Sequence, residues 1–346
     1  MIPLAFCIPG DLSLPTGGYR YDREVLARLA DHGVDALHVA LGAGYPDPSP
    51  EDIARTEAQL ATISPRTILL IDGLALGAMP PAMLAALPHK KLALVHHPLG
   101  LEAGLSPERT AFLLTNEKAV LEKIHHTIVT SPLTKRLLMH DFKLPERSIS
   151  VAEPGTARAP RAVGTGHPLQ VLAVGAVSAR KAYDHLVLAL STLSDVDWHL
   201  TIAGSLDLSP QATHDLQASI RKCALDKRIT LTGAVDDATL DGLYARADIF
   251  AMSSLFEGYG MALTEALARG LPIVASSGGA ATDTVPDHCT IKVPPGDVAA
   301  LTKALRRVMT DQALRHRMAD AAWAAAALLP SWDDTARDVA DVIKAL

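Results

Sequence analysis

Two glutamates, Glu257 and Glu265, are separated by seven residues, and the first of these are Gly258-Tyr259-Gly260-Met261. The apolar run Asp248–Met252 precedes them, and the helical pattern that follows ends at Gly270. Ligands of open α/β sheets bind at the carboxyl ends of strands. Glycines let a ligand approach the backbone closely, and the start of a helix favours an anion. The pattern therefore predicts a strand, loop and helix that receive an anionic group.

The two carboxylates would not bind that anion, but ionised carboxylates accept hydrogen bonds from hydroxyl groups. A ligand with a diphosphate between two polyhydroxyl groups meets both requirements, and a nucleotide sugar is such a ligand. The alternative interpretation is a capped helix with solvated glutamates. For either glutamate alone, the capped helix and the ligand site are equally good interpretations. The pair of glutamates, together with Gly258-Tyr259-Gly260 between a strand and a helix, favours the ligand site.

The block from Ser254 to Ser276 resembles the glutamate-x7-glutamate motif of retaining glycosyltransferases of family 4, which have the GT-B fold. The resemblance implies transfer of a sugar from a UDP- or GDP-linked donor to a glycan, lipid-linked or small-molecule acceptor. It also implies same-face attack, with the departing phosphate accepting the acceptor's proton. Weaker matches follow in the expected order, at Pro15–Tyr19, Val174–Gly175, Arg180–Lys181, Leu231–Val235 and Val293–Asp297.

The same resemblance implies a role for each site residue. Glu257 would hold hydroxyls of the donor sugar and Glu265 those of the ribose. The residues with an implied catalytic role are His96, Glu257 and Lys181. Those with an implied role in donor binding are Gly17, Gly18, Arg180, Lys181, Val235, Gly258, Tyr259, Gly260, Met261 and Glu265.

One position departs from the family's pattern. Ala176 follows Val174-Gly175 at the place where the family usually has a basic residue. Either Arg180 replaces that residue, or the diphosphate has one cationic contact fewer. An ordinary solvated basic pair at a helix start is the alternative for Arg180 and Lys181.

His96 and His97 end the strand expected at Leu92–His97, where the family places a histidine near the transferred sugar. We expect His96 to face the sugar because it continues the strand. His97 is the alternative, since side chains alternate between the two faces of a strand. An imidazole there can donate to a sugar oxygen or accept the acceptor's proton. His97 and Glu102 are candidates for the acceptor side.

The elements that must position these residues form two series of apolar runs alternating with helix-length segments. Continuous apolar runs are typical of parallel strands buried on both faces, and the alternation favours right-handed βαβ units. The first series extends from Leu4–Ile8 to Ile149–Ala152, and the second from Val171–Val174 to Thr290–Val293. The small, aperiodic segment Thr156–Pro168 is typical of a linker.

We therefore expect an α/β protein with two Rossmann-like domains whose parallel sheets face a central cleft. Residues 1–160 would form the acceptor-side domain and residues 161–330 the donor domain. Residues 331–346 would form a last helix that begins near Ser331-Trp332 and crosses back to the first domain.

Composition excludes several classes of protein. The 346 residues suit two globular domains, with 49% hydrophobic and 20% charged residues. No apolar run approaches the roughly 18 residues that a membrane span needs. The net charge is 32 − 38 = −6, which is unfavourable for a general nucleic-acid binder. The three distant cysteines, Cys7, Cys223 and Cys289, are typical of a reducing cytoplasm.

Neither a metal nor another cofactor is expected. Asp195-Val196-Asp197 precedes a strand instead of following one, and no Cys/His zinc spacing occurs. Two rival functions remain open, a nucleotide-sugar epimerase of the same fold and a non-catalytic nucleotide-sugar-binding protein. The basic segment Thr134–Arg147 could contact an anionic membrane at its inner face, although a solvated helix face is favoured. The base, sugar, acceptor and oligomeric state are left open.

Overall fold

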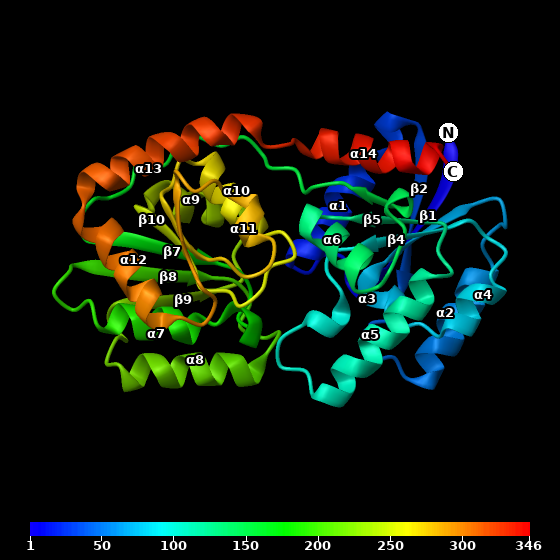
Figure 1. The fold of residues 1–346 in the computed structure, drawn as a ribbon, viewed down its shortest axis with the longest axis horizontal. Coiled ribbons are helices and arrows are strands. Elements are labelled where there is room, and N and C mark those ends of the chain that lie inside the picture. Colours follow the sequence, from blue (N-terminus) through cyan, green and yellow to red (C-terminus); the bar gives the residue numbers. More distant parts are fainter. The chain divides into compact units, whose positions relative to one another are not determined.

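The computed structural model describes residues 1–346 and divides into two compact units (Figure 1). Unit 1 comprises Met1–Gly155 and Pro330–Leu346, and unit 2 comprises Thr156–Leu329. The chain thus enters unit 2 at Thr156, five residues earlier than the boundary expected at 161. The α/β class and the two parallel sheets expected from the sequence are confirmed.

Unit 1 is built on a six-stranded parallel sheet with the order β2-β1-β3-β4-β5-β6. Strands β3 and β4 are buried along their whole length, which explains their continuous apolar sequence. The strands are β1 Ile2–Pro9, β2 Val34–Leu41, β3 Ile68–Asp72, β4 Lys91–Val95, β5 His126–Val129 and β6 Ile149–Val151.

Three helices of unit 1 begin at Ser-Pro pairs. Ser49, Ser106 and Ser131 each accept a hydrogen bond from the third residue of the helix, and proline follows at the first helical position. Both choices suit a helix start. The helices are α1 Gly17–Arg28, α2 Pro50–Ala61, α3 Gly73–Leu76, α4 Pro81–Ala86, α5 Pro107–Leu121, α6 Pro132–His140 and α14 Trp332–Lys344.

The last helix, α14, is part of unit 1 and packs against α1 (Figure 1). Ser331 caps it in a capping box with Asp334. Trp332 is buried, and its ring meets Tyr21 edge-on with centroids 5.9 Å apart. A side chain at Gly155 would clash with the backbone of Trp332. The first turn of α14 is therefore fitted closely into unit 1.

Unit 2 contains the second six-stranded parallel sheet, with the order β12-β11-β10-β7-β8-β9. Its strands are β7 Leu169–Val174, β8 Trp198–Ala203, β9 Ile229–Gly233, β10 Ile249–Met252, β11 Ile273–Ser276 and β12 Thr290–Val293. Its helices are α7 Tyr183–Ser191, α8 Pro210–Lys222, α9 Asp237–Arg246, α10 Met261–Ala268, α11 Ala281–Thr284, α12 Val298–Thr310 and α13 Gln312–Ala325.

Each sheet has one place where the strand order reverses. In unit 1 it lies between β1 and β3, because β2 and β3 flank β1. In unit 2 it lies between β7 and β10, because β8 and β10 flank β7. Ligands of doubly wound sheets bind at the carboxyl ends of the strands beside such a reversal. The loops at these two places are therefore the expected positions of a ligand site.

Candidate functional site

In unit 2, the loops that follow β7 and β10 are joined by hydrogen bonds. The short helix η4, Ala179–Lys181, lies in the first loop, and residues 253–260 form the second. The amide of Leu255 donates to the carbonyl of Arg180 at 2.8 Å, and the hydroxyl of Ser253 donates to the carbonyl of Lys181 at 2.9 Å. The basic pair is therefore fixed beside the glutamate-bearing loop, directly at the reversal of strand order.

A third loop, after β11, holds Glu257 by its backbone. The Glu257 amide donates to the carbonyl of Gly278 at 3.2 Å, and the Glu257 carbonyl accepts from the amide of Ala280 at 2.8 Å. Gly279 has a φ of +64°, and a Cβ there would lie 2.8 Å from the Glu257 amide nitrogen. Only glycine fits this close approach. The sequence motif did not single out Gly279, although a Gly-Gly pair at a strand end is a visible signal.

Lys181 and Arg180 both pair with the side chain of Glu257. Lys181 Nζ lies 2.7 Å from Oε1, and a terminal nitrogen of Arg180 lies 3.2 Å from Oε2. The Glu257 side chain is 7% exposed. Burial alone would raise the pKa of Glu257, but the two cations outweigh it and lower that pKa to about 2. The carboxylate is thus ionised, and the three side chains together carry one positive charge.

The position of Arg180 supports the first alternative for Ala176, in which Arg180 supplies the basic side chain that the family usually has there. Its guanidinium lies 3.2 Å from Glu257. Its guanidinium also donates to the carbonyl of Phe256 at 2.9 Å. The stem of Lys181 crosses Gly175, where a Cβ would lie 2.8 Å from its Cε and where φ is +142°. Gly175 therefore leaves the space through which Lys181 reaches Glu257.

Ala182, which follows Lys181, has left-handed backbone angles of φ 45° and ψ 46°. These angles cost a non-glycine residue roughly 1–2 kcal/mol. We expect Ala182→Gly to raise the free energy of unfolding by about 0.5–1 kcal/mol, after the entropy that glycine gains in the unfolded chain. Urea denaturation of the full chain measures this. Ala224→Gly, at a φ of 54° outside the site, should give a similar gain; if Ala182→Gly lowers stability, the strain argument is wrong.

The helix α10 begins as expected, with Gly260 as its N-cap at φ 95°. Tyr259 is buried, and its carbonyl accepts from the hydroxyl of Thr284 at 2.6 Å. Gly258 and Met261 flank this segment and are half-buried. The first amides of a helix have no intrahelical acceptor, so this end of α10 can bind an anion.

Glu265 lies one turn into α10 and is half-buried. Its Oε2 accepts a hydrogen bond from the hydroxyl of Tyr244 at 2.8 Å. Val235 lies elsewhere, just beyond β9 at the edge of the sheet, and β7 and β8 separate that strand from β10. The structure thus groups Glu265 with α10, and it places Val235 at a different strand end.

In unit 1, Gly17 and Gly18 are the first two residues of α1, and the side chain of Thr16 caps the helix. A Cβ at Gly18 would lie 3.4 Å from the ring of His96. The glycine-rich loop and the histidine, which are far apart in sequence, therefore meet at the reversal of strand order in unit 1.

The fourth strand is shorter than expected, because β4 ends at Val95 and both histidines lie in the bend beyond it. The hydroxyls of Thr130 and Thr134 donate to the carbonyl of His96 at 3.2 and 3.3 Å, in place of a strand partner. The two rings have different partners. His97 Nε2 lies 3.1 Å from Glu102, which joins the two acceptor-side candidates.

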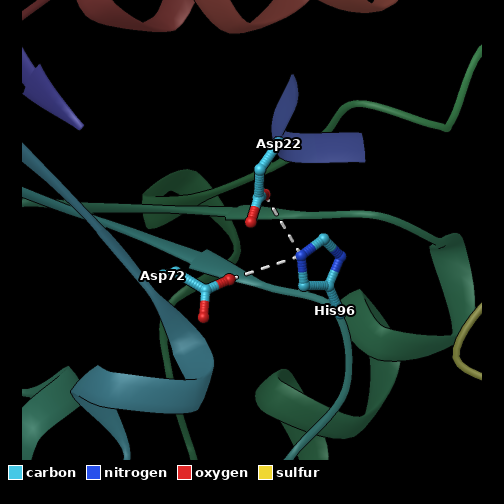
Figure 2. A group of neighbouring side chains, drawn as sticks. All are labelled: Asp22, Asp72 and His96. Atoms are coloured by element: carbon cyan, nitrogen blue, oxygen red, sulfur yellow. Dashed lines mark ion pairs between the residues drawn. The ribbon is translucent and has the colours of Figure 1, made fainter. Parts of the chain in front are cut away.

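His96 instead faces two carboxylates that the sequence did not reveal. Its Nε2 lies 3.4 Å from Asp22 of α1 and 3.4 Å from Asp72 at the end of β3 (Figure 2). The Asp22 and Asp72 side chains are 1% and 3% exposed. Burial alone would lower the pKa of His96, but the two carboxylates outweigh it and raise that pKa to about 10. The one sequence signal for this cluster was Asp72, an acidic residue at the end of a predicted strand.

Comparison with solved structures defines the class of fold. Sucrose-phosphate synthase from Thermosynechococcus elongatus aligns with a TM-score of 0.84 and 21% identity, over 100% of this chain and 99% of that chain. Anabaena HepE, solved in complex with UDP-glucose, aligns with a TM-score of 0.76 and 16% identity over 100% of both chains. The protein has the GT-B fold of these structures.

Sequence comparison relates unit 2 to a protein family. Residues 160–324 match the family described as "Glycosyl transferases group 1". The D-inositol 3-phosphate glycosyltransferase of Xylanimonas cellulosilytica is 31% identical over 196 residues, which are 56% of this chain and 46% of that protein. The chain thus spans about half the length of this curated relative. The match to the group 1 glycosyl transferase family lies wholly within unit 2.

No helix of the protein combines the length and the apolar composition that a membrane crossing requires.

Proposed function

We propose that the protein is a retaining glycosyltransferase of family 4 that uses a UDP- or GDP-sugar as donor. The acceptor would be a glycan, a lipid-linked sugar or a small molecule. The observation that carries the proposal is the cluster of Glu257, Arg180 and Lys181 at the strand-order reversal of unit 2. It combines a net positive charge with an ionised carboxylate, as a diphosphate next to a sugar requires.

The proposed chemistry is electrostatic. Lys181, Arg180 and the first amides of α10 stabilise the diphosphate as the bond to the sugar breaks. Glu257 accepts hydrogen bonds from sugar hydroxyls, and Glu265 accepts them from the ribose. The acceptor attacks from the side that the diphosphate leaves, and the departing phosphate takes the acceptor's proton. No metal ion or other cofactor enters this scheme.

For unit 1 we propose that the amides of Gly17 and Gly18 bind phosphate oxygens and that His96 lies beside the transferred sugar. A nucleotide-sugar donor is supported by the similarity to HepE, which was solved with UDP-glucose. Transfer to an acceptor is supported by the similarity to a D-inositol 3-phosphate glycosyltransferase. Roles for Val235 in base contact, and for His97 and Glu102 on the acceptor side, are part of the proposal.

A nucleotide panel with thermal unfolding as readout tests the donor assignment. We expect UDP or GDP to raise the melting temperature and the corresponding monophosphates to raise it less. Lys181→Gln should weaken binding by about 10–100-fold, because it removes a charge-assisted contact. Lys222→Gln, on the exposed end of α8, is the matched control and should bind normally. If no nucleotide diphosphate stabilises the protein, the donor assignment is wrong.

Release of free nucleotide distinguishes the transferase from its rivals. A transferase releases UDP or GDP at a rate that depends on the acceptor. An epimerase consumes the donor without any acceptor. A non-catalytic binding protein is stabilised by the donor but shows no turnover with any acceptor mixture.

A further inference from the structure

We propose that Asp22 and Asp72 are positioning residues that hold His96 as an imidazolium, so that the ring acts as a charged hydrogen-bond donor and not as a base. The proposal rests on the proposed function in one respect, since it takes His96 to be the residue beside the transferred sugar. It adds the protonation state of the ring and the two residues that set it.

The two carboxylates approach the same nitrogen of the ring. Asp22 comes from α1 and Asp72 from the end of β3, and each places an oxygen 3.4 Å from His96 Nε2 (Figure 2). Nε2 is itself buried. A proton on Nε2 therefore lies between two acidic groups and is shielded from water, which favours its retention.

The ring is also fixed in orientation. Tyr21 meets it edge-on, with centroids 5.3 Å apart and planes at 85°. A Cβ at Gly18 would be in van der Waals contact with the ring, 3.4 Å from its Cδ2. The carbonyl of His96 is held by two threonine hydroxyls. The imidazole is thus in contact with Tyr21 and Gly18, and its backbone carbonyl is held by two hydrogen bonds.

The charges of the surrounding carboxylates favour a cation at this position. Both oxygens of Asp22 are buried without a hydrogen-bond partner, and His96 Nε2 lies 3.4 Å from Oδ1. The guanidinium of Arg23, the next residue of α1, donates hydrogen bonds to the carbonyls of Leu12 and Leu14. The hydroxyl of Tyr19 donates to the carbonyl of Pro9.

The proton balance of the three side chains agrees with this geometry. Burial and the Asp72 charge raise the pKa of Asp22 to about 7, against the opposing effect of His96. The pKa of His96 is raised to about 10. Near neutral pH the ring is therefore protonated, because the pKa of His96 lies well above 7.

The second nitrogen, Nδ1, lies on the side of the ring away from the carboxylates (Figure 2). The side chain is 23% exposed while Nε2 is buried, so the exposed area belongs to other atoms of the side chain. The imidazolium presents an N–H donor there and has no lone pair to accept a proton. The acceptor's proton must then leave by another group, and the departing phosphate of the proposed mechanism is such a group.

Nitrogen-15 NMR of histidine side chains in the full chain tests the protonation state directly. We expect His96 to remain protonated on both nitrogens at least to pH 8.5. In Asp22→Asn its pKa should fall by about 1–3 units, because an opposite charge is lost. Asp333→Asn removes the partner of the exposed pair with His32 and should leave His96 unchanged. A neutral His96 at pH 7 in the native protein overturns the proposal.

The pH profile of transfer tests the positioning role. The native enzyme should show no loss of rate from His96 deprotonation below about pH 9. Asp22→Asn should keep near-native activity at pH 6 and lose it about tenfold per unit above the lowered pKa. A uniform loss at every pH would show a structural role only and overturn the proposal. Asp72→Asn, which can still cap α3 through its Oδ1, should behave like Asp22→Asn.

Two further results would distinguish this proposal from a metal site and from a failure of the proposed function. Because the ligand atoms of the three residues lie within 4.8 Å of one another, calorimetry with Zn²⁺ should be run. Uptake of one equivalent, lost in Asp22→Asn, would make the cluster a metal site and overturn the proposal. If the native protein transfers no sugar but His96 is protonated by NMR, the proposed function has failed while the assignment of the imidazolium stands.

Discussion

Glu257→Gln is expected to lower transfer by about 100- to 1,000-fold while the affinity for UDP or GDP stays equal or rises. The substitution removes the ionised acceptor for the sugar hydroxyls and keeps the shape of the side chain. In the native protein Arg180 and Lys181 pair with Glu257. In the variant both cations would be available to contact phosphate. Calorimetric titration with the nucleotide and with the nucleotide sugar, together with steady-state rates, measures both effects.

The comparison of the two ligands makes this prediction specific. Affinity for the nucleotide sugar should fall relative to that for the bare nucleotide, because only the former presents sugar hydroxyls. Glu24→Gln, which removes the partner of Arg28 on the surface of α1, is the matched control and should change neither. Equal losses of nucleotide affinity and of transfer would contradict a role for Glu257 at the sugar. Glu257→Ala should show the same separation, with lower stability from the emptied space.

Gly279→Ala is expected to destabilise the protein by several kcal/mol and to reduce transfer strongly. A methyl group there meets the backbone of Glu257 and adds the cost of a left-handed φ of +64°. Overpacking costs about 1–3 kcal/mol, and the backbone strain adds about 1–3 kcal/mol. Since Gly279 adjoins the residues that bind the Glu257 backbone, the carboxylate should be displaced from Lys181.

Gly296→Ala separates the two causes. Gly296 has a similar φ of +79°, but nothing lies within 4 Å of the position that its Cβ would occupy. It should therefore show only the strain, about 1 kcal/mol, and keep normal transfer. Denaturant unfolding and initial rates measure both variants. If the two variants are equally stable and equally active, the contact between Gly279 and Glu257 has no importance for the site.

The grouping of these residues in unit 2 could be predicted because its signal is local in the sequence. Glu257, the N-terminus of α10 and Glu265 occupy one short strand, loop and helix, so spacing alone places them together. The strands were found for a similar reason, since a buried parallel strand is apolar along its length. The end of β4 was misjudged, because threonine hydroxyls from another segment, and not a neighbouring strand, bind the carbonyl of His96.

The cluster in unit 1 could not be predicted in the same way. Asp22, Asp72 and His96 belong to three separate elements, and their meeting depends on β1, β3 and β4 being consecutive in the sheet. A single sequence does not state that order. The pairing of Arg180 and Lys181 with Glu257 was missed for the same reason, since β7 and β10 are neighbours in space and far apart along the chain.

The place of α14 in unit 1 means that unit 2 is an insertion within the other domain. The chain leaves unit 1 after Gly155 and returns at Pro330, and Gly155 lies against Trp332, so the two ends of the insertion are adjacent. Residues 1–155 expressed alone would leave the α1 surface around Tyr21 uncovered. We therefore expect the separable pieces of this protein to be residues 156–329, and a unit 1 in which Gly155 is fused to Pro330.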